Sequence, residues 1–589
     1  MASEIAVTAR RGGPQRVGLV SRHAGLADST FLVLVILASV IPYAGRLGFY
    51  SDDWAFLGAL HTSGDQTVLG LASRQLQFPY PVTPSGRPVQ VVYQAALYKL
   101  FGLEPLGYHL VNTAMLIVMA LLLSLTLREL GLPRSLVLAT PLVFALLPNY
   151  STDRFWFAAF GYILSMALCF LSLYANLRAV RTRGVALLSW KLVSLLALVT
   201  SGLGIEIAIP LLALNPILAF LHARRQLPGG LQRRLGRWPA GLFLGSDLLL
   251  LLVVLAYKRV AGGELGLPPG WLPFHIGQLV FGSTAINFGT YGVGLPYTVW
   301  RSVADLSWPL VAVGMVLAAA VYGYFIVALR GEREHWAVSR PAWIRLAVVG
   351  TLLYALSYAL FLPTGRIVIT STGIGNRVAV AATLGVAIVL LAACGWVSSL
   401  ARSPTSRRRS FSMLVAGLCL SGFIVTNSVA LYWQAASSRE AAVLRSIRQA
   451  LPDLPPHSTL ILHGICPYVG PGIVFESDWD LSGALQVMYR DETIRADVTR
   501  RMTIASSGLS TRTYGAVPVV HRFGGDLLLY DYSRSSVTPL PDERTALRAL
   551  GSQRPAPPPG CEKGAPGRGV TIFPIDELYF WLEVRRFHP

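Results

Sequence analysis

Charged residues are scarce in this 589-residue chain: only 14% of its residues are Asp, Glu, Lys or Arg, whereas 53% are hydrophobic. Soluble globular domains carry about 25% charged residues, so the composition excludes an ordinary soluble protein. Several apolar runs approach the roughly 20 residues that cross a bilayer as a helix. The shortage of charge therefore predicts an integral membrane protein with several spans.

Acidic residues are the scarcer sign, with 30 Asp and Glu against 50 Lys and Arg. The formal net charge of +20 would suit a nucleic-acid partner, but the arginines stand mostly in short segments between apolar runs. That placement is typical of basic loops that orient a protein in a membrane. We therefore expect membrane lipids, and no nucleic acid, around this chain.

Cysteine occurs only five times, and no dedicated metal-binding motif is present. Cys169, Cys394 and Cys419 fall within apolar runs, where we expect reduced thiols that pack in the interior. Cys466 and Cys561 both fall in the C-terminal segment, where one disulfide would be compatible with an oxidising compartment.

The apolar runs predict eleven membrane spans. They cover residues 29–48, 106–128, 135–149, 155–177, 185–201, 204–222, 239–257, 304–329, 342–362, 378–399 and 411–433. No small-residue cleavage site follows the first run, so it is expected to be a retained span. If the basic tail, residues 1–28, is cytoplasmic, every inside loop carries arginine and the C-terminal segment lies outside.

The outer segment between the first two spans, residues 49–105, is unusually long and begins with the acidic pair Asp52 and Asp53. Ser51 is expected to cap a short helix over residues 52–57, and residues 89–101 predict a second amphipathic helix along the membrane. In a purely structural interpretation, the two carboxylates would only compensate the dipole of the first helix.

On this topology a second group of basic residues falls on the outer side, against the orienting rule. Guanidinium groups present planar donor forks to phosphate oxygens, so together these residues predict an outer phosphate-binding site. They are Arg74, Arg87, Lys258, Arg259, Arg301, Arg366 and Arg377. Taken singly, Arg74 and Arg301 would equally suit anionic lipid headgroups.

Several motifs follow one another along the chain, most of them in its first 230 residues. They comprise Asp52-Asp53 after the first span, Arg87-Pro88 before the second helix, Gly102, Pro105, Tyr108-His109 and Asn112, then Pro148, Asp153 and Trp156, then Glu206, and finally Asn376-Arg377 near the tenth span. This ordered set resembles GT-C type glycosyltransferases, and most of all the protein O-mannosyltransferases and related polyprenyl-phosphate-sugar transferases. In this sequence Asp153 replaces the more usual Glu.

The resemblance implies a membrane all-α, GT-C-like bundle of about eleven transmembrane helices in a prokaryotic plasma (inner) membrane, with a structured first outer loop. It implies transfer of a sugar from a polyprenyl-phosphate donor to a hydroxyl of a glycan, lipid or protein acceptor. Asp53, or otherwise Asp52, would be the general base, and direct displacement would invert the anomeric centre. Supporting residues would be Asp153, Trp156, Glu206 and His109. No cofactor is certain, and a divalent metal on Asp52 and Asp53 remains open.

Residues 29–433 would then form the catalytic transmembrane domain, and residues 434–589 a soluble outer domain of α/β or α+β type. Its pattern predicts a helix over residues 439–451, strands over 459–463 and 526–532, and an irregular loop over 554–568. Acceptor binding and a structural cap are the two interpretations of this domain.

Asp247, inside the seventh apolar run, is expected to make an interhelical hydrogen bond, and a proton-transfer role is the alternative. Residues 274–281 are too short to span and predict an interfacial or re-entrant stretch, either a lid or a plain covering loop. For the whole chain, a transporter or flippase, a ligase or polymerase of lipid-linked glycans and a non-enzymatic scaffold are the rival classes.

Overall fold

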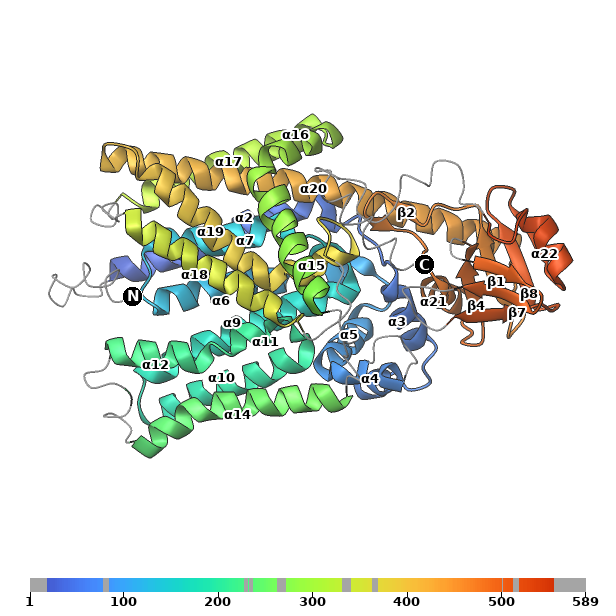
Figure 1. The fold of residues 1–589 in the computed structure, drawn as a ribbon, viewed down its shortest axis with the longest axis horizontal. Coiled ribbons are helices and arrows are strands. Elements are labelled where there is room, and N and C mark those ends of the chain that lie inside the picture. Colours follow the sequence, from blue (N-terminus) through green and yellow to red (C-terminus); the bar gives the residue numbers. More distant parts are fainter. Residues whose placement is uncertain are drawn as a thin grey trace.

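The computed structural model describes residues 19–77, 84–226, 231, 237–261, 272–330, 340–362, 369–499, 502–511 and 518–555. Within these ranges, ten helices are long and apolar enough to cross a membrane. They are built on α2 (Leu19–Ala44), α6 (Pro105–Glu129), α9 (Phe160–Arg181), α10 (Gly184–Gly204), α12 (Asn215–Gln226), α14 (Arg237–Ala261), α17 (Trp308–Ala328), α18 (Arg340–Ala359), α19 (Val380–Ser398) and α20 (Pro404–Ala450). They form one helical bundle (Figure 1), which confirms the predicted polytopic membrane architecture.

The remaining predicted span, residues 135–149, contains a shorter helix. α7 (Arg134–Leu146) has 13 residues, which is about 20 Å at 1.5 Å per residue and less than the ~30 Å hydrocarbon core. Pro148 follows it and disfavours the helical conformation at Leu147, whose ψ is 139°. Nearly every side chain of α7 is buried, and the helix packs against α2, α6, α19 and α20. Of the eleven predicted spans, ten are thus helices of full spanning length among the described residues, and the one at 135–149 is a shorter helix.

Short helices gather at the end of the bundle that adjoins the C-terminal domain (Figure 1), which we call the domain end. Those labelled there are α3 (Asp52–His61), α4 (Val68–Gln77) and α5 (Pro88–Phe101). The other short helices are η1 (Pro84–Gly86), η2 (Pro148–Tyr150), α8 (Thr152–Phe155), η3 (Phe157–Ala159), η4 (Glu206–Ala208), α11 (Ile209–Leu212) and η7 (Ile374–Ala379). α3 and α5 confirm the two helices predicted in the first inter-span segment. That segment is a structured part of the fold.

The predicted capping role of Ser51 is wrong. Ser51 precedes α3 with a φ of 47°, and its side chain makes no cap hydrogen bond. Its hydroxyl instead donates to Glu476 Oε1 at 3.0 Å, in the C-terminal domain. Positive φ is unfavourable for a residue with a Cβ, so the surrounding contacts must hold this conformation in place.

The stretch before α17 is helical and anchored in the bundle. It comprises α15 (Leu272–Thr284), the π-helix η5 (Ala285–Val293) and α16 (Leu295–Asp305). Tyr291 in η5 donates to Ser371 O at 2.5 Å, and Asn149 Nδ2 donates to Asn287 Oδ1 at 2.8 Å. The short stretch predicted at 274–281 is thus part of a longer helix, and its role as a lid stays a prediction.

α20 connects the bundle to the C-terminal domain without interruption. Its 47 residues extend ~70 Å at 1.5 Å per residue, so the helix continues beyond its membrane-spanning part into the domain (Figure 1). The helix predicted at 439–451 is therefore the end of α20. The expected domain boundary between residues 433 and 434 lies inside this helix.

The C-terminal domain is built around a four-stranded sheet in the order β4-β1-β8-β9. β1 (Thr459–His463) pairs in parallel with β4 (Arg495–Val498) and β8 (Leu527–Asp531), and β9 (Ser536–Pro539) pairs antiparallel with β8. The other elements are β2 (Tyr468–Val469), β3 (Gly472–Ile473), α21 (Asp478–Tyr489), the antiparallel sheet of β5 (Met502–Ala505), β6 (Gly508–Thr511) and β7 (Val519–Arg522), and α22 (Glu543–Leu550). Both predicted strands and the α/β character of the domain are confirmed.

The alternating side chains of β1 explain how the sheet holds the domain together. Leu460 and Leu462 pack into the large core shared with α20 and α21, while Ile461 packs on the opposite face with Leu527 and Leu529. Successive side chains of a strand point to opposite faces, so one short strand stabilises two layers.

The cysteines agree with the sequence analysis as far as they are described. Cys169, Cys394 and Cys419 are free and buried. Cys466 is disulfide-bonded. Cys561, its expected partner, lies outside the described residues, as does most of the loop predicted over 554–568.

Candidate active site

Asp53 is fully buried, and both oxygens of its carboxylate accept hydrogen bonds from backbone N–H groups. Oδ2 accepts from Tyr50 at 2.9 Å and from Phe157 at 3.3 Å, and Oδ1 accepts from Ala158 at 2.7 Å. Burial raises the pKa of Asp53 well above its ordinary value, and the three hydrogen bonds oppose that shift. Asp53 thereby fastens the start of α3 to η3.

Asp52 has different surroundings, because adjacent residues of a helix point about 100° apart. Its side chain is only half-buried, and Oδ1 accepts a hydrogen bond from Trp479 Nε1 at 3.1 Å. Its negative charge acts on the guanidinium groups of both Arg87 and Arg377. Of the two adjacent carboxylates, Asp52 is the one whose charge acts on the expected phosphate-binding residues Arg87 and Arg377.

Arg87 and Lys258 bind the same carboxylate, that of Glu206. Arg87 Nε donates to Oε2 at 3.2 Å and its Nη2 donates to Oε1, while Lys258 Nζ donates to Oε2 at 2.9 Å. Lys258 also donates to Gly86 O at 3.0 Å. Burial tends to lower the pKa of Arg87, but Glu206 and the nearby Asp52 hold it above its ordinary value. The ends of α5, η4 and α14 thus meet at one point.

Arg377 in η7 supplies a second guanidinium group to this site. It lies over the ring of Trp156 at 4.9 Å, a cation–π contact, and it interacts with Tyr162 and Arg87. Its Nη1 is buried and has no hydrogen-bond partner among the described residues. A buried donor without a partner is costly, so this atom has the capacity to bind an anionic ligand.

Together these groups form a compact charged cluster at the domain end. We call it the anion cluster; its members are Asp52, Arg87, Tyr162, Glu206, Lys258 and Arg377. Three cations face two carboxylates within it, so the cluster carries one excess positive charge. Such an arrangement is suited to a single anionic ligand.

Asp153 and Asn376 lie next to the anion cluster, in a buried polar layer. The Asn376 side chain binds the η2–α8 turn, donating to Asn149 O at 2.8 Å and accepting from Thr152 N at 3.1 Å. Neither carboxylate oxygen of Asp153 has a hydrogen-bond partner among the described residues. Burial raises the pKa of Asp153 well above its ordinary value, with Arg377 acting in the opposite direction.

Trp156 and His109 are buried and contact the segment that precedes α3. Trp156 Nε1 donates to Tyr50 O at 2.8 Å, so the ring beneath Arg377 also holds the residue next to Ser51. His109 is buried edge-on against Phe160, with ring centroids 5.3 Å apart. Its position is that of a packed residue.

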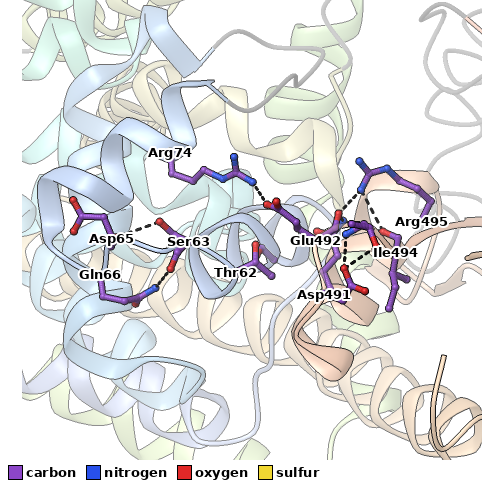
Figure 2. A network of polar contacts seen from close by, with 12 residues as sticks. Thr62, Ser63, Asp65, Gln66, Arg74, Asp491, Glu492, Ile494 and Arg495 are labelled. Atoms are coloured by element: carbon purple, nitrogen blue, oxygen red, sulfur yellow. Dashed lines mark hydrogen bonds and ion pairs between the residues drawn. The ribbon is translucent and has the colours of Figure 1, made fainter. Parts of the chain in front are cut away.

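Three of the predicted phosphate-binding residues that the structure describes, Arg74, Arg259 and Arg301, do not join the anion cluster. Arg74 pairs with Glu492 of the C-terminal domain (Figure 2). Arg259 is exposed at the end of α14, and Arg301 is exposed on α16. Arg366 lies outside the described residues. Basic residues predicted on the same side of the membrane therefore make different contacts.

Asp247 makes the interhelical contact that we predicted. Its Oδ2 lies 2.7 Å from Lys191 Nζ and accepts from Asn176 Nδ2 at 3.1 Å. These residues join α14, α10 and α9 inside the bundle. The network stabilises helix packing and is separate from the anion cluster.

Two residues of the site were missed by the sequence analysis. Tyr162 lies on α9, six residues after Trp156 in the chain. Only the amphipathic pattern at the start of this helix could have indicated it. Trp479 belongs to the C-terminal domain, 427 positions from Asp52. No spacing in the sequence indicates the contact between Trp479 and Asp52.

The acidic pair does not form a two-carboxylate ligand set for a divalent cation, because both oxygens of Asp53 are bound by backbone N–H groups. Among the described residues there is also no group of three or more His, Cys, Asp or Glu side chains that could hold a metal ion. We therefore derive no step through a metal bridging Asp52 and Asp53.

No protein-family model and no curated protein matches the chain. Among solved structures, ArnT from Cupriavidus metallidurans bound to undecaprenyl phosphate is similar with a TM-score of 0.35 and 15% identity, over 79% of this chain and 84% of ArnT. ArnT in the apo state gives a TM-score of 0.35 and 16% identity, over 78% and 84%. These similarities are too weak to assign a function to this chain. The function is therefore inferred from the anion cluster.

Proposed function

We propose that this protein is a GT-C type glycosyltransferase that moves a sugar from a polyprenyl-phosphate donor to an acceptor hydroxyl at the domain end of the bundle. One arrangement carries the proposal: Arg87 and Lys258 bind the carboxylate of Glu206, and the charge of Asp52 acts on Arg87 and Arg377. A candidate base and two phosphate-binding groups thus share one site, although they come from distant parts of the chain.

The charge of the anion cluster fits the donor. A sugar linked to a polyprenyl phosphate is a phosphodiester with one negative charge, which the single excess positive charge of the cluster neutralises. When the sugar leaves, the phosphate becomes a dianion, and fixed cations stabilise that developing charge without reorganising. The unpartnered Nη1 of Arg377 and the Lys258 ammonium are placed to contribute.

The surroundings of Lys258 fit a lipid-linked phosphate better than a free one. Its neighbours on α14 include Val260 and Tyr257, which are 86% and 40% exposed. Apolar side chains exposed at the end of a membrane helix face lipid tails or the interface. A phosphate held at Lys258 would therefore have its isoprenoid chain beside an apolar surface.

Asp52 is the proposed general base, and Asp53 a positioning residue. The acceptor hydroxyl is a poor nucleophile, and a base within hydrogen-bond reach contributes about 10²–10⁴ in rate. Asp53 has both oxygens bound by backbone groups, whereas the charge of Asp52 acts on the guanidinium groups of Arg87 and Arg377. Attack by one activated hydroxyl opposite the phosphate would invert the anomeric centre.

The proposal also includes the orientation of the protein in its membrane. The domain end would face the outside of a prokaryotic plasma membrane, with the N-terminal basic tail in the cytoplasm, as the distribution of arginine predicts. The acceptor, whether glycan, lipid or protein, would approach from the side of the C-terminal domain, which adjoins α3 at this end (Figure 1).

The test is sugar transfer by the purified full-length protein in liposomes, with radiolabelled polyprenyl-phosphate sugars and a cell-envelope acceptor mixture. Transfer by the wild type and its collapse in Asp52→Asn, with unchanged melting temperature, would support the proposal. Movement of intact donor across the bilayer without bond cleavage would favour a flippase instead. Equal transfer by wild type and Asp52→Asn would exclude Asp52 as the base.

A further inference from the structure

The first turn of α21 extends from the C-terminal domain into the proposed active site. Trp479 is the second residue of α21, and its Nε1 donates to Asp52 Oδ1 at 3.1 Å. The Ser51 hydroxyl lies 3.3 Å from the same oxygen. Asp52 is therefore bound by a donor that the transmembrane bundle does not supply.

We infer that the C-terminal domain completes the active site, with Trp479 as the positioning residue that orients the Asp52 carboxylate and keeps it ionised for use as a base. A hydrogen bond to a carboxylate favours its charged form and restricts its rotation. The inference rests on the proposed function, since it assigns Trp479 a role in the chemistry of Asp52.

The start of α21 is held rigidly enough for this role. Asp480 is fully buried, and its carboxylate accepts from Glu476 N at 2.7 Å and from Ser477 N at 3.2 Å. Glu476 in turn accepts from the Ser51 hydroxyl at 3.0 Å. Two hydrogen bonds, Ser51 to Glu476 and Trp479 to Asp52, thus join the residues that begin α3 to those that begin α21.

Close packing of backbone against backbone fixes the position of α21 relative to α3. A Cβ added at Gly483 would lie 2.1 Å from Trp54 O, and one added at Gly58 would lie 2.9 Å from Gly483 Cα. No side chain separates the two helices at this point, so any larger residue must push them apart. Both glycines are therefore needed to bring Trp479 within reach of Asp52.

Two more polar contacts cross the same boundary. Trp54 Nε1 donates to Glu440 Oε1 at 3.0 Å at the far end of α20, and Arg74 pairs with Glu492 (Figure 2). A domain attached only by a flexible linker would not share such a set of contacts with the first inter-span segment. The C-terminal domain and α3 form one structural unit around Asp52.

The experiment compares Trp479→Phe with the wild type in the liposome transfer assay, over a range of pH. Phe retains an aromatic ring but removes the N–H donor, so we expect kcat to fall about tenfold or more, as for loss of a hydrogen bond to a charged group. The acidic limb of the kcat profile should move to higher pH, while KM for the donor stays within about twofold. Trp308→Phe, which changes a 79% exposed indole on α17, is the matched control.

A second variant tests the same inference through packing. Gly483→Ala forces α21 away from α3 without touching the indole, and it should reproduce the loss of kcat and the shift of the acidic limb. Wild-type transfer together with unchanged rates and pH profiles in Trp479→Phe would overturn this inference alone. Failure of the wild type to transfer any sugar would overturn the proposed function, and this inference with it.

Discussion

Asp53 accepts a hydrogen bond from the backbone N–H of Ala158 at 2.7 Å, deep in the protein and 105 positions away in the chain. This bond turns the Asp53 carboxylate toward η3, while the charge of the adjacent Asp52 acts on Arg87 and Arg377. Asp52 and Asp53 are chemically identical and adjacent, yet Asp53 has a structural role and Asp52 is proposed to be catalytic.

Replacing Asp53 should therefore reduce stability first. In Asp53→Asn the amide NH₂ would face backbone donors and leave at least one buried N–H without an acceptor, at a cost of about 1–3 kcal/mol. We expect a lower melting temperature in detergent, measured by intrinsic fluorescence. Asp526→Asn, at an exposed carboxylate, is the control and should melt with the wild type.

Replacing Asp52 should instead reduce activity at constant stability. Asp52→Asn preserves the size of the side chain and the acceptor for Trp479 Nε1 but removes the base, so transfer should fall by about 10²–10⁴. Steady-state rates at saturating donor measure this effect. If Asp52→Asn transferred sugar at the wild-type rate, Asp52 would not be the base and would only compensate the dipole of α3.

Arg377 should determine donor affinity through its planar guanidinium group. Arg377→Lys keeps the charge but loses the donor fork and the stacking over Trp156, so KM for the donor should rise about tenfold or more. Arg259→Lys, at an exposed arginine near the same end of the bundle, is the matched control. Similar KM values for the two variants would place the phosphate away from Arg377.

The buried pair of Lys191 and Asp247 should contribute to stability without affecting catalysis. Asp247→Leu leaves the Lys191 ammonium without its carboxylate and should cost about 3–5 kcal/mol of unfolding free energy. The double variant Lys191→Leu with Asp247→Leu should recover most of that loss, because no buried charge is left unpaired. Melting temperatures of the wild type, Asp247→Leu and the double variant test this. Loss of sugar transfer in a double variant that is as stable as the wild type would contradict the separation of this network from the anion cluster.

Asp478 should make stability depend on pH near neutrality. Burial, with a smaller effect of Asp497, raises the pKa of Asp478 to about 6. The folded protein thus binds this proton more tightly than the unfolded chain, so the contribution to stability is present at low pH and is lost as the pH rises through 6. The difference in melting temperature between Asp478→Asn and the wild type should grow in favour of the variant from pH 5 to pH 7. A constant difference would show that Asp478 does not titrate in this range.

The amino-acid sequence by itself determined that this is an integral membrane protein with several spans, and it determined where most of the helices and the central strands lie. Hydrophobicity and turn residues act locally, so the long spans, α3, α5, β1 and β8 were predictable from short windows. The acidic pair and the basic residues Arg87, Lys258 and Arg377 were also identified, because residue type alone indicates their chemistry.

Only the tertiary structure decided how those residues are used. The pairing of Glu206 with Arg87 and Lys258, the use of Arg74 in the domain contact and the bond from Trp479 to Asp52 all join residues far apart in the chain. The proposed choice of Asp52 over Asp53 as the base rests on the hydrogen bonds that Asp53 accepts from the N–H groups of η3. Such contacts depend on how segments separated by up to hundreds of residues pack together, and no local pattern encodes that packing.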